Sequence, residues 1–225
     1  MVMRYQRKFG FALAVLMAAN LLVPTVRSTH AAEEGKLQKL IVALGSDDLA
    51  VRRDAAYDLA KIGPDAAPAV SALIDALKDR DEQIRFQSTM ALARIGPAAA
   101  AAVPVLIELL TSRDDQHRYR AAYALGQIGT AALPALHDAL ESERASIRLG
   151  AARALGWMKE EARPEIPRLI ELLDDGDPRV VRQATGALGS IGQVAELRSE
   201  EHTSELQSRR NLVCRRLLEK KNPPP

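Results

Sequence analysis

Residues 98–129 read AAAAAVPVLIELLTSRDDQHRYRAAYALGQIG, and this stretch is one of five copies of a unit that recurs along the chain. Successive copies close 33, 33, 30 and 33 residues apart, at Gly63, Gly96, Gly129, Lys159 and Gly192. A fixed period of this size is typical of solenoids, because each unit buries its apolar face only by stacking on its neighbours. The period therefore predicts a stack of similar units.

Each unit contains the signals for two helices. In the quoted copy, Val103, Leu106 and Leu110 recur at helical spacing, which predicts a first helix of about three turns. A polar turn ending at Asp114 follows, and an aspartate there accepts hydrogen bonds from the free N–H groups of the next helix. Gly129 then ends the second helix. The sequence predicts an all-α solenoid of about five antiparallel helix pairs.

Aligned positions on the second helices separate a core stripe from a contact stripe. One position holds a large apolar residue in every copy: Leu59, Leu92, Leu125, Leu155 and Leu188. Two other positions, four residues apart, hold nothing larger than threonine: Ala56, Thr89, Ala122, Ala152 and Thr185, then Ala60, Ala93, Gly126, Gly156 and Gly189. Small residues let helices approach closely, so we expect the second helices to pack side by side.

A charged pattern accompanies the repeat. Aspartate stands before the second helix at Asp48, Asp81, Asp114 and Asp177, and arginine follows four residues later at Arg52, Arg85, Arg118 and Arg148. This D-x-x-[V/I]-R arrangement, with the ending A-A-x-x-L-x-x-I-G, resembles HEAT repeats over residues 36–192, specifically the short HEAT-like subclass named after bilin lyases. The resemblance implies an Asp–Arg ladder from repeat to repeat and second helices on the concave side. Arg144 and Val181 break the pattern, although Arg182 is a candidate substitute.

The N-terminal residues 1–31 have the pattern of a secretory signal peptide. Basic residues precede an apolar run of about fifteen residues, and small residues surround Ala31, after which we expect cleavage. The run is shorter than the roughly twenty residues that span a bilayer. We therefore expect a periplasmic or secreted protein without stable membrane insertion after cleavage. The alternative is an uncleaved N-terminal helix that anchors the protein to the membrane.

The repeat pattern stops at Arg198. In residues 198–225, the segments RSEEHTSELQS and LVCRRLLEKK resemble the translation of a sequencing adapter. We therefore expect a HEAT-like repeat domain over residues 32–197, truncated at its C-terminal end, followed by a non-native tail. The chain's single cysteine, Cys214, belongs to this tail, which agrees with an oxidising compartment for the native segment.

Charge and motifs narrow the function. Residues 32–197 hold 20 basic and 25 acidic side chains, a net charge of −5, which argues against a nonspecific nucleic-acid partner.

His117 occupies a position held elsewhere by valine or isoleucine, and His137 with Glu141 lacks further ligands for a metal. The sequence has no phosphate loop, haem-attachment motif or nucleophile elbow. We expect neither a cofactor nor a metal site, and no catalysis. Bilin lyase activity is disfavoured, since an exported protein would not meet a cytoplasmic pigment.

The outward positions of the second helices form a ridge rich in aromatic residues, arginine and glutamine. These are the residue types expected of an interface, although ordinary solvent-exposed surface is the simpler alternative. The sequence predicts a protein–protein binding or scaffolding module with a protein or peptide partner on this concave face. The alternative is an accessory domain of a larger exported enzyme whose catalytic part followed Leu197. The candidate binding residues are Tyr57, Gln87, Arg94, Arg120, Tyr123, Arg153 and Trp157.

Overall fold

The computed structural model describes residues 33–199, and this part of the chain is helical throughout, with no β-strand. Residues 1–32 and 200–225 lie outside it; they contain the predicted signal peptide, residues 1–31, and all but the first two residues of the predicted tail, residues 198–225. The second helices of the five units are α2 (Leu49–Ile62), α4 (Glu82–Ile95), α6 (Asp115–Ile128), α8 (Ala145–Met158) and α10 (Pro178–Ser199). The first helices are residues 33–43, α3 (Val70–Ala76), α5 (Val103–Leu109), α7 (Leu133–Leu140) and α9 (Ile166–Glu171).

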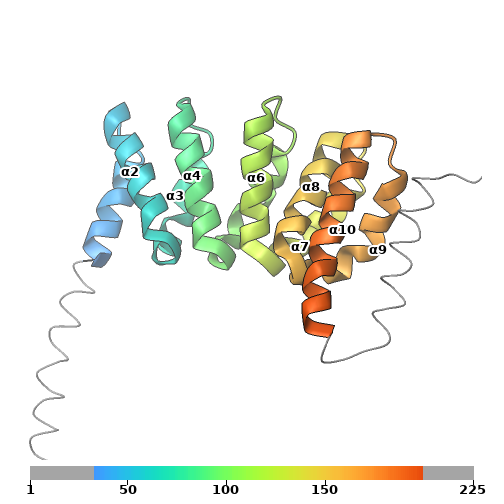
Figure 1. The fold of residues 1–225 in the computed structure, drawn as a ribbon. Coiled ribbons are helices and arrows are strands. Elements are labelled where there is room, and N and C mark those ends of the chain that lie inside the picture. The colour runs from blue at the N-terminus through green and yellow to red at the C-terminus, as the bar shows by residue number, and fades with distance from the viewer. Residues whose placement is uncertain (1–32, 200–225) are drawn as a thin grey trace, which may run out of the picture.

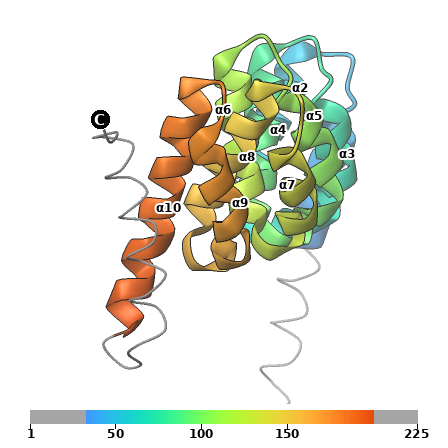
Figure 2. The same ribbon diagram turned by 90° about the vertical axis from the view of Figure 1, so that its right-hand side faces the viewer.

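The helices form two layers. Figure 1 shows the second helices side by side in one row from α2 to α10, and Figure 2, turned by 90°, shows the first helices as a separate layer beside them. Each helix pair packs on the next, so the core runs along the length of the stack. This arrangement confirms the predicted all-α solenoid.

The first helices are shorter than the sequence predicts. Each of the last four units opens with a 3-10 segment: η1 (Gly63–Ala69), η2 (Gly96–Ala102), η3 (Gly129–Ala132) and η4 (Lys159–Glu165). A further 3-10 turn, η5 (Leu172–Asp174), follows α9. Prolines such as Pro64 and Pro68 lie inside these segments, where the missing N–H and fixed φ disfavour a regular α-helix.

A left-handed residue makes the turn between successive units. Gly63, Gly96 and Gly129 have φ values of 73°, 69° and 73°, which glycine adopts without a steric penalty from Cβ. Lys159 has φ 53° at the same place, so the fourth unit keeps the turn without glycine. The prediction that Gly192 closes the fifth unit is wrong, because α10 continues through it to Ser199. No 3-10 segment follows it within the described residues, so the backbone stays helical there.

The aligned columns occupy the places that the sequence predicts. Leu59, Leu92, Leu125 and Leu155 are fully buried, and Leu188 is 5% exposed. The small column brings helices together: a Cβ on Gly126 would lie 3.0 Å from the carbonyl oxygen of Ala154 in α8. That distance is tighter than ordinary van der Waals contact, so a side chain on residue 126 would push against α8 at its present spacing.

The turn before each second helix is fixed by side chains of that helix. Asp48, Asp81 and Asp114 accept hydrogen bonds from backbone N–H groups at the starts of α2, α4 and α6. The arginine four residues later donates from Nη1 back to a carbonyl of the turn; the pairs are Arg52–Ser46, Arg85–Asp79, Arg118–Ser112 and Arg148–Ser142. The spacing of aspartate and arginine is therefore a device that closes each unit.

The ladder between repeats differs in detail from the one predicted. Arg52 Nε lies 2.9 Å from Asp79 Oδ2, and Arg148 Nε lies 2.6 Å from Asp175 Oδ2, so the acceptors precede the expected aspartates by two residues. The matching positions elsewhere hold Ser112 and Ser142, which offer no carboxylate. The predicted substitution by Arg182 is wrong, since its side chain makes no hydrogen bond or ion pair within residues 33–199.

Asp81 takes part in the ladder through a different arginine. Arg53 Nε donates to Asp81 Oδ1 at 3.0 Å, and this hydrogen bond lowers the pKa of Asp81 to about 2. The pair joins α2 to the start of α4, and the same carboxylate caps that helix. Asp81 stays ionised at neutral pH and serves both contacts at once.

One stretch of the described residues, Glu82–Leu109, is long and apolar enough to cross a membrane. Half of its apolar window is buried inside the solenoid. The stretch is also interrupted, because Gly96 adopts φ 69° between α4 and η2. Its role in the core accounts for its apolar composition.

Gly126 and Gly189 offer a matched test of close helix packing, because both lie inside second helices. A Cβ on Gly126 would meet α8, whereas one on Gly189 would meet nothing within 4 Å. We expect Gly126→Ala to lower the free energy of unfolding by about 1–3 kcal/mol. Gly189→Ala should leave it unchanged or raise it by up to about 1 kcal/mol, since alanine favours helix. Urea denaturation measures both, and a loss of similar size in the two variants would contradict this packing.

Candidate functional site

The predicted binding residues lie along the row of second helices but divide into two groups. Tyr57 is 48% exposed at the N-terminal end of the row, and Lys61 Nζ lies 4.3 Å above its ring. Gln87 is half-buried on α4. Tyr123, Arg153 and Trp157 come together where α6 meets α8. The structure therefore brings together only the predicted residues at the boundary of α6 and α8, while Tyr57 and Gln87 lie apart from them on α2 and α4.

Two of the predicted arginines make contacts within the solenoid. Arg94 Nη1 donates to the carbonyl oxygen of Ala60 at 2.7 Å, which joins α4 to the last turn of α2. The Arg120 guanidinium lies 4.3 Å from the centre of the Phe86 ring, and its Nη1 is 3.8 Å from Glu82 Oε1. These contacts make Arg94 and Arg120 braces between neighbouring second helices.

Three aromatic rings form a cluster across α6 and α8. The Trp157 ring meets Tyr119 at 5.2 Å and Tyr123 at 5.3 Å, in both cases edge to face with an angle of 87°. Such pairs contribute about 0.5–1.5 kcal/mol beyond their buried area. Tyr119 was not among the predicted residues, although it precedes Tyr123 by four positions and so shares its helix face. It is 48% exposed, so the cluster reaches the surface there.

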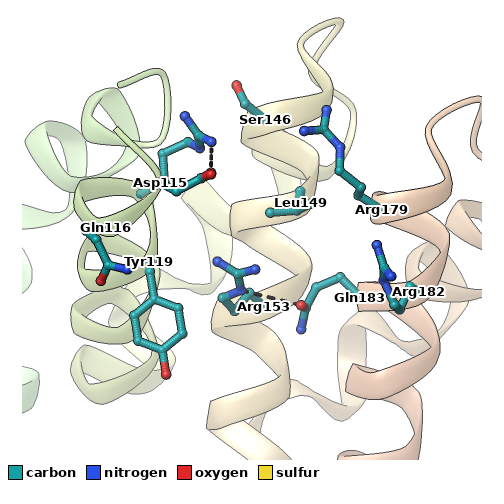
Figure 3. Close-up of a pocket in the computed structure, with 10 residues that line it drawn as sticks. Asp115, Gln116, Tyr119, Ser146, Leu149, Arg153, Arg179, Arg182 and Gln183 are labelled. Carbon is teal, nitrogen blue, oxygen red and sulfur yellow. Dashed lines mark hydrogen bonds and ion pairs between the residues drawn. The ribbon is translucent and has the colours of Figure 1, made fainter. Parts of the chain in front are cut away.

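A cavity of about 330 Å³ opens beside this cluster, between α6, α8 and α10. Figure 3 shows side chains from the three helices around one shared space. We call it the arginine pocket, because four of its ten lining residues are arginines. The lining residues are Asp115, Gln116, Arg118, Tyr119, Ser146, Leu149, Arg153, Arg179, Arg182 and Gln183.

Two arginines of the pocket have carboxylate partners. Arg118 pairs with Asp115, which lies in the same turn of α6. Arg179 Nη2 lies 2.8 Å from Asp177 Oδ2, and the hydrogen bonds from Arg179 lower the pKa of Asp177 to about 2. Asp177 is therefore ionised at neutral pH, and each of these two arginines has a carboxylate beside it.

The other two arginines of the pocket have no carboxylate partner within the described residues. Arg153 donates from Nε to Gln183 Oε1 at 3.4 Å and lies 5.3 Å from the centre of the Tyr119 ring. Burial lowers the pKa of Arg153, because the charged guanidinium loses water. Arg182 is exposed and makes no side-chain hydrogen bond within the same residues. The pocket thus carries uncompensated positive charge.

The sequence pattern predicts half of the pocket residues as outward positions of the second helices, but only one of them is among the predicted binding residues. The five are Gln116, Ser146, Arg153, Arg179 and Gln183, and the predicted binding residue is Arg153. Tyr119 and Arg182 occupy one aligned position of the repeat, beside the positions that define the ridge. The sequence holds a signal for Arg182, because no acidic residue lies three or four positions away from it on α10. The repeat pattern does not indicate that this position faces outward, because its exposure depends on how α6, α8 and α10 are spaced.

The histidines have acidic neighbours. His117 is partly buried, as predicted, and its Nδ1 lies 3.5 Å from Asp114 Oδ2. Ligand atoms of Glu82, Asp114 and His117 lie within 4.8 Å of one another. We assign no metal to this trio, because Asp114 already caps α6 and the Arg120 guanidinium faces Glu82.

His137 contacts the next repeat instead of the residue that the sequence suggested. Its Nδ1 lies 2.9 Å from Glu165 Oε2, and that carboxylate is buried. The pairing with Glu141 considered from the sequence is therefore replaced, because Glu141 contacts Arg168. His137 joins α7 to the start of α9 and belongs to the inter-repeat contacts.

Comparisons with known proteins agree with this architecture. The sequence model of the HEAT-repeat family matches residues 37–115 and 103–189 of this chain. An archaeal HEAT-like repeats protein from Thermococcus onnurineus NA1 has a TM-score of 0.54 at 15% identity, over 84% of this chain and 89% of that one. This likeness shows the fold.

Two further solved structures are similar. The complex of CpcE and CpcF of phycocyanin lyase from Nostoc sp. PCC7120 has a TM-score of 0.49 at 27% identity, over 76% of this chain and 73% of that one. A designed armadillo repeat protein, solved in complex with a (KR)4 peptide, has a TM-score of 0.48 at 17% identity, over 80% of this chain and 98% of that one. No curated protein matches. Because the family match spans most of the chain and the stacked helix pairs agree with it, this chain belongs to the family of HEAT repeats.

Proposed function

We propose that this protein is a non-catalytic binding module whose row of second helices holds a segment of a partner protein. The observation that carries the proposal is the aromatic cluster of Tyr119, Tyr123 and Trp157 beside Arg153, an arginine without a carboxylate partner among the described residues. Aromatic residues and arginine dominate the energetically important centres of protein interfaces. A row of parallel helices presents such groups in line, which suits an extended peptide.

The ridge residues then have different roles. Tyr57, Tyr123, Arg153 and Trp157 remain candidates for contact with the partner, because they are exposed or half-buried on the second helices. We assign Arg94 and Arg120 to bracing, since their guanidinium groups already contact neighbouring helices. The binding centre lies between α6 and α10, and Tyr57 extends the surface towards the N-terminal end.

The assignment of Arg94 gives a direct prediction. Arg94→Ala removes the hydrogen bond to the Ala60 carbonyl, so it should lower the free energy of unfolding by about 1 kcal/mol. The affinity of the Arg94→Ala variant for a peptide that the wild type binds should change little. Thermal denaturation and a binding titration on the same sample separate the two effects. A variant with unchanged stability and strongly reduced affinity would return Arg94 to the binding site.

The absence of catalysis is part of the proposal. Its support is the lack of catalytic motifs in the sequence and the roles of the two histidines of the repeat domain, His117 and His137. Each lies against a carboxylate, Asp114 or Glu165, that also belongs to a helix start. These pairs have a structural explanation in the stacking of units.

The binding face can be tested without knowledge of the partner. A displayed library of random peptides is selected against the full chain, and the selected peptides are titrated against variants. Tyr123→Ala combined with Arg153→Ala should weaken binding by at least about 30-fold, because the loss of even one interface anchor costs about 2 kcal/mol or more. The control pair, Glu108→Ala with Asp138→Ala, changes exposed residues on α5 and α7 and should leave affinity unchanged.

Two results would contradict the proposed face. Binding that survives in the second-helix variant but is lost in the control variant would place the partner on the first helices. A library that yields no peptide with measurable affinity would count against peptide binding altogether. Circular dichroism of each variant confirms that the solenoid stays folded.

We further propose that the protein is exported. The support is the order of a basic start, an apolar run and small residues before Ala31 in residues 1–31. When the full chain is expressed in a bacterial host, mass spectrometry should find periplasmic protein that begins at Ala32. Intact protein in the membrane fraction would favour the anchored alternative, and intact cytoplasmic protein would contradict export.

A further inference from the structure

We propose that the arginine pocket binds a side-chain carboxylate of an acidic peptide, with Arg153 and Arg182 as the residues that pair with it. This inference rests on the proposed peptide-binding function and names the chemistry of the partner. Four arginines and one carboxylate, that of Asp115, line the pocket. Once Asp115 and Asp177 have neutralised Arg118 and Arg179, Arg153 and Arg182 remain unpaired within the described residues.

Arg153 is the stronger of the two signals. Its guanidinium is half-buried between the Tyr119 ring and Gln183. Burying a cation costs free energy unless an anion or several hydrogen bonds compensate it. The long 3.4 Å hydrogen bond to an uncharged amide compensates only weakly. A carboxylate from outside would supply the missing partner.

The geometry leaves the right atoms of Arg153 available. Gln183 accepts from Nε, and the two terminal NH2 groups make no hydrogen bond within the part of the chain that the structure describes. A planar guanidinium donates two parallel hydrogen bonds to a carboxylate, which is the strongest arrangement for this pair of groups. Figure 3 shows Gln183 of α10 reaching towards Arg153 of α8, with Arg182 on α10 next to Gln183.

Size and charge favour a carboxylate over a polyanion. At about 330 Å³ the cavity is at the small end of ligand sites, so it fits one side chain or a short segment. Residues 32–197 carry a net charge of −5, so the positive potential is confined to the pocket. A nucleic acid requires a longer track of cations to neutralise successive phosphates. In an acidic peptide, one side-chain carboxylate pairs with the arginines of the pocket, and the apolar groups of the peptide contact the aromatic cluster.

The probe is a blocked oligopeptide in which glutamate alternates with glycine, and its control has glutamine in place of glutamate. Binding to the full chain is followed by the fluorescence of Trp157, the chain's single tryptophan, which contacts the pocket residue Tyr119. We expect the glutamate peptide to change this fluorescence with saturation, and the glutamine peptide to bind roughly tenfold more weakly or worse. Isothermal titration calorimetry confirms the affinity by an independent signal.

Three variants locate the charge. Arg153→Gln and Arg182→Gln should each lower the affinity for the glutamate peptide by roughly tenfold or more. Arg182 is exposed and unpaired, so its replacement is not expected to affect folding even if Arg153→Gln does. The matched control is Arg80→Gln, which removes the same charge from an exposed position in the turn between α3 and α4. Its affinity for the peptide should equal that of the wild type.

The outcomes separate this inference from the proposed function. Equal binding of the two peptides, or affinity unchanged by both pocket variants, would overturn the carboxylate pocket. If library-selected peptides still depended on Tyr123 and Trp157, the second-helix face would stand as a binding surface of other chemistry. A single-stranded oligonucleotide that bound more tightly than the glutamate peptide and depended on the same arginines would overturn the peptide assignment.

Discussion

The close approach of successive second helices is the constraint on which the rest of the structure depends. Residues without bulky side chains, such as Gly126 and Gly156, lie against the next helix, and a Cβ at Gly156 would be 3.3 Å from Ala187 Cα. The leucine column can then fill the space between the layers completely. Because every unit repeats this contact, the outward positions of the second helices also fall in register, and side chains from three helices reach one pocket.

Side chains at the turns hold the units at this spacing. The helix-capping aspartates and the arginines that donate back to turn carbonyls appear in successive units, as at Asp81 and Arg85. The ladder pairs of Arg52 and Arg148 form where the next turn supplies an extra aspartate, Asp79 or Asp175. Arg153 also contacts neighbouring helices, through Gln183 and the Tyr119 ring, but its guanidinium has no carboxylate partner within the described residues. A half-buried arginine without an anionic partner is the observation on which the proposed ligand rests.

The repeat columns made the fold predictable, because burial in a solenoid follows from position within the unit. Leu125 and Leu155 are buried, as their columns indicated. Contacts between units were harder to predict, since they depend on the offset between helices and on side-chain rotamers. That is why the ladder acceptor was placed at Asp177 instead of Asp175, and why Arg94 was read as a binding residue although it braces α2. The pocket residues Tyr119 and Arg182 were missed for the same reason.

The central claim is that a ligand lies on the second helices between α6 and α10. Hydrogen–deuterium exchange of the full chain, with and without a saturating acidic peptide, tests it most directly, because exchange reports the protection of backbone amides along the whole stack. The account predicts slower exchange at the N-terminal halves of α8 and α10 and in the facing part of α6. Protection confined to α3, α5, α7 and α9, or no change along the chain, would contradict it.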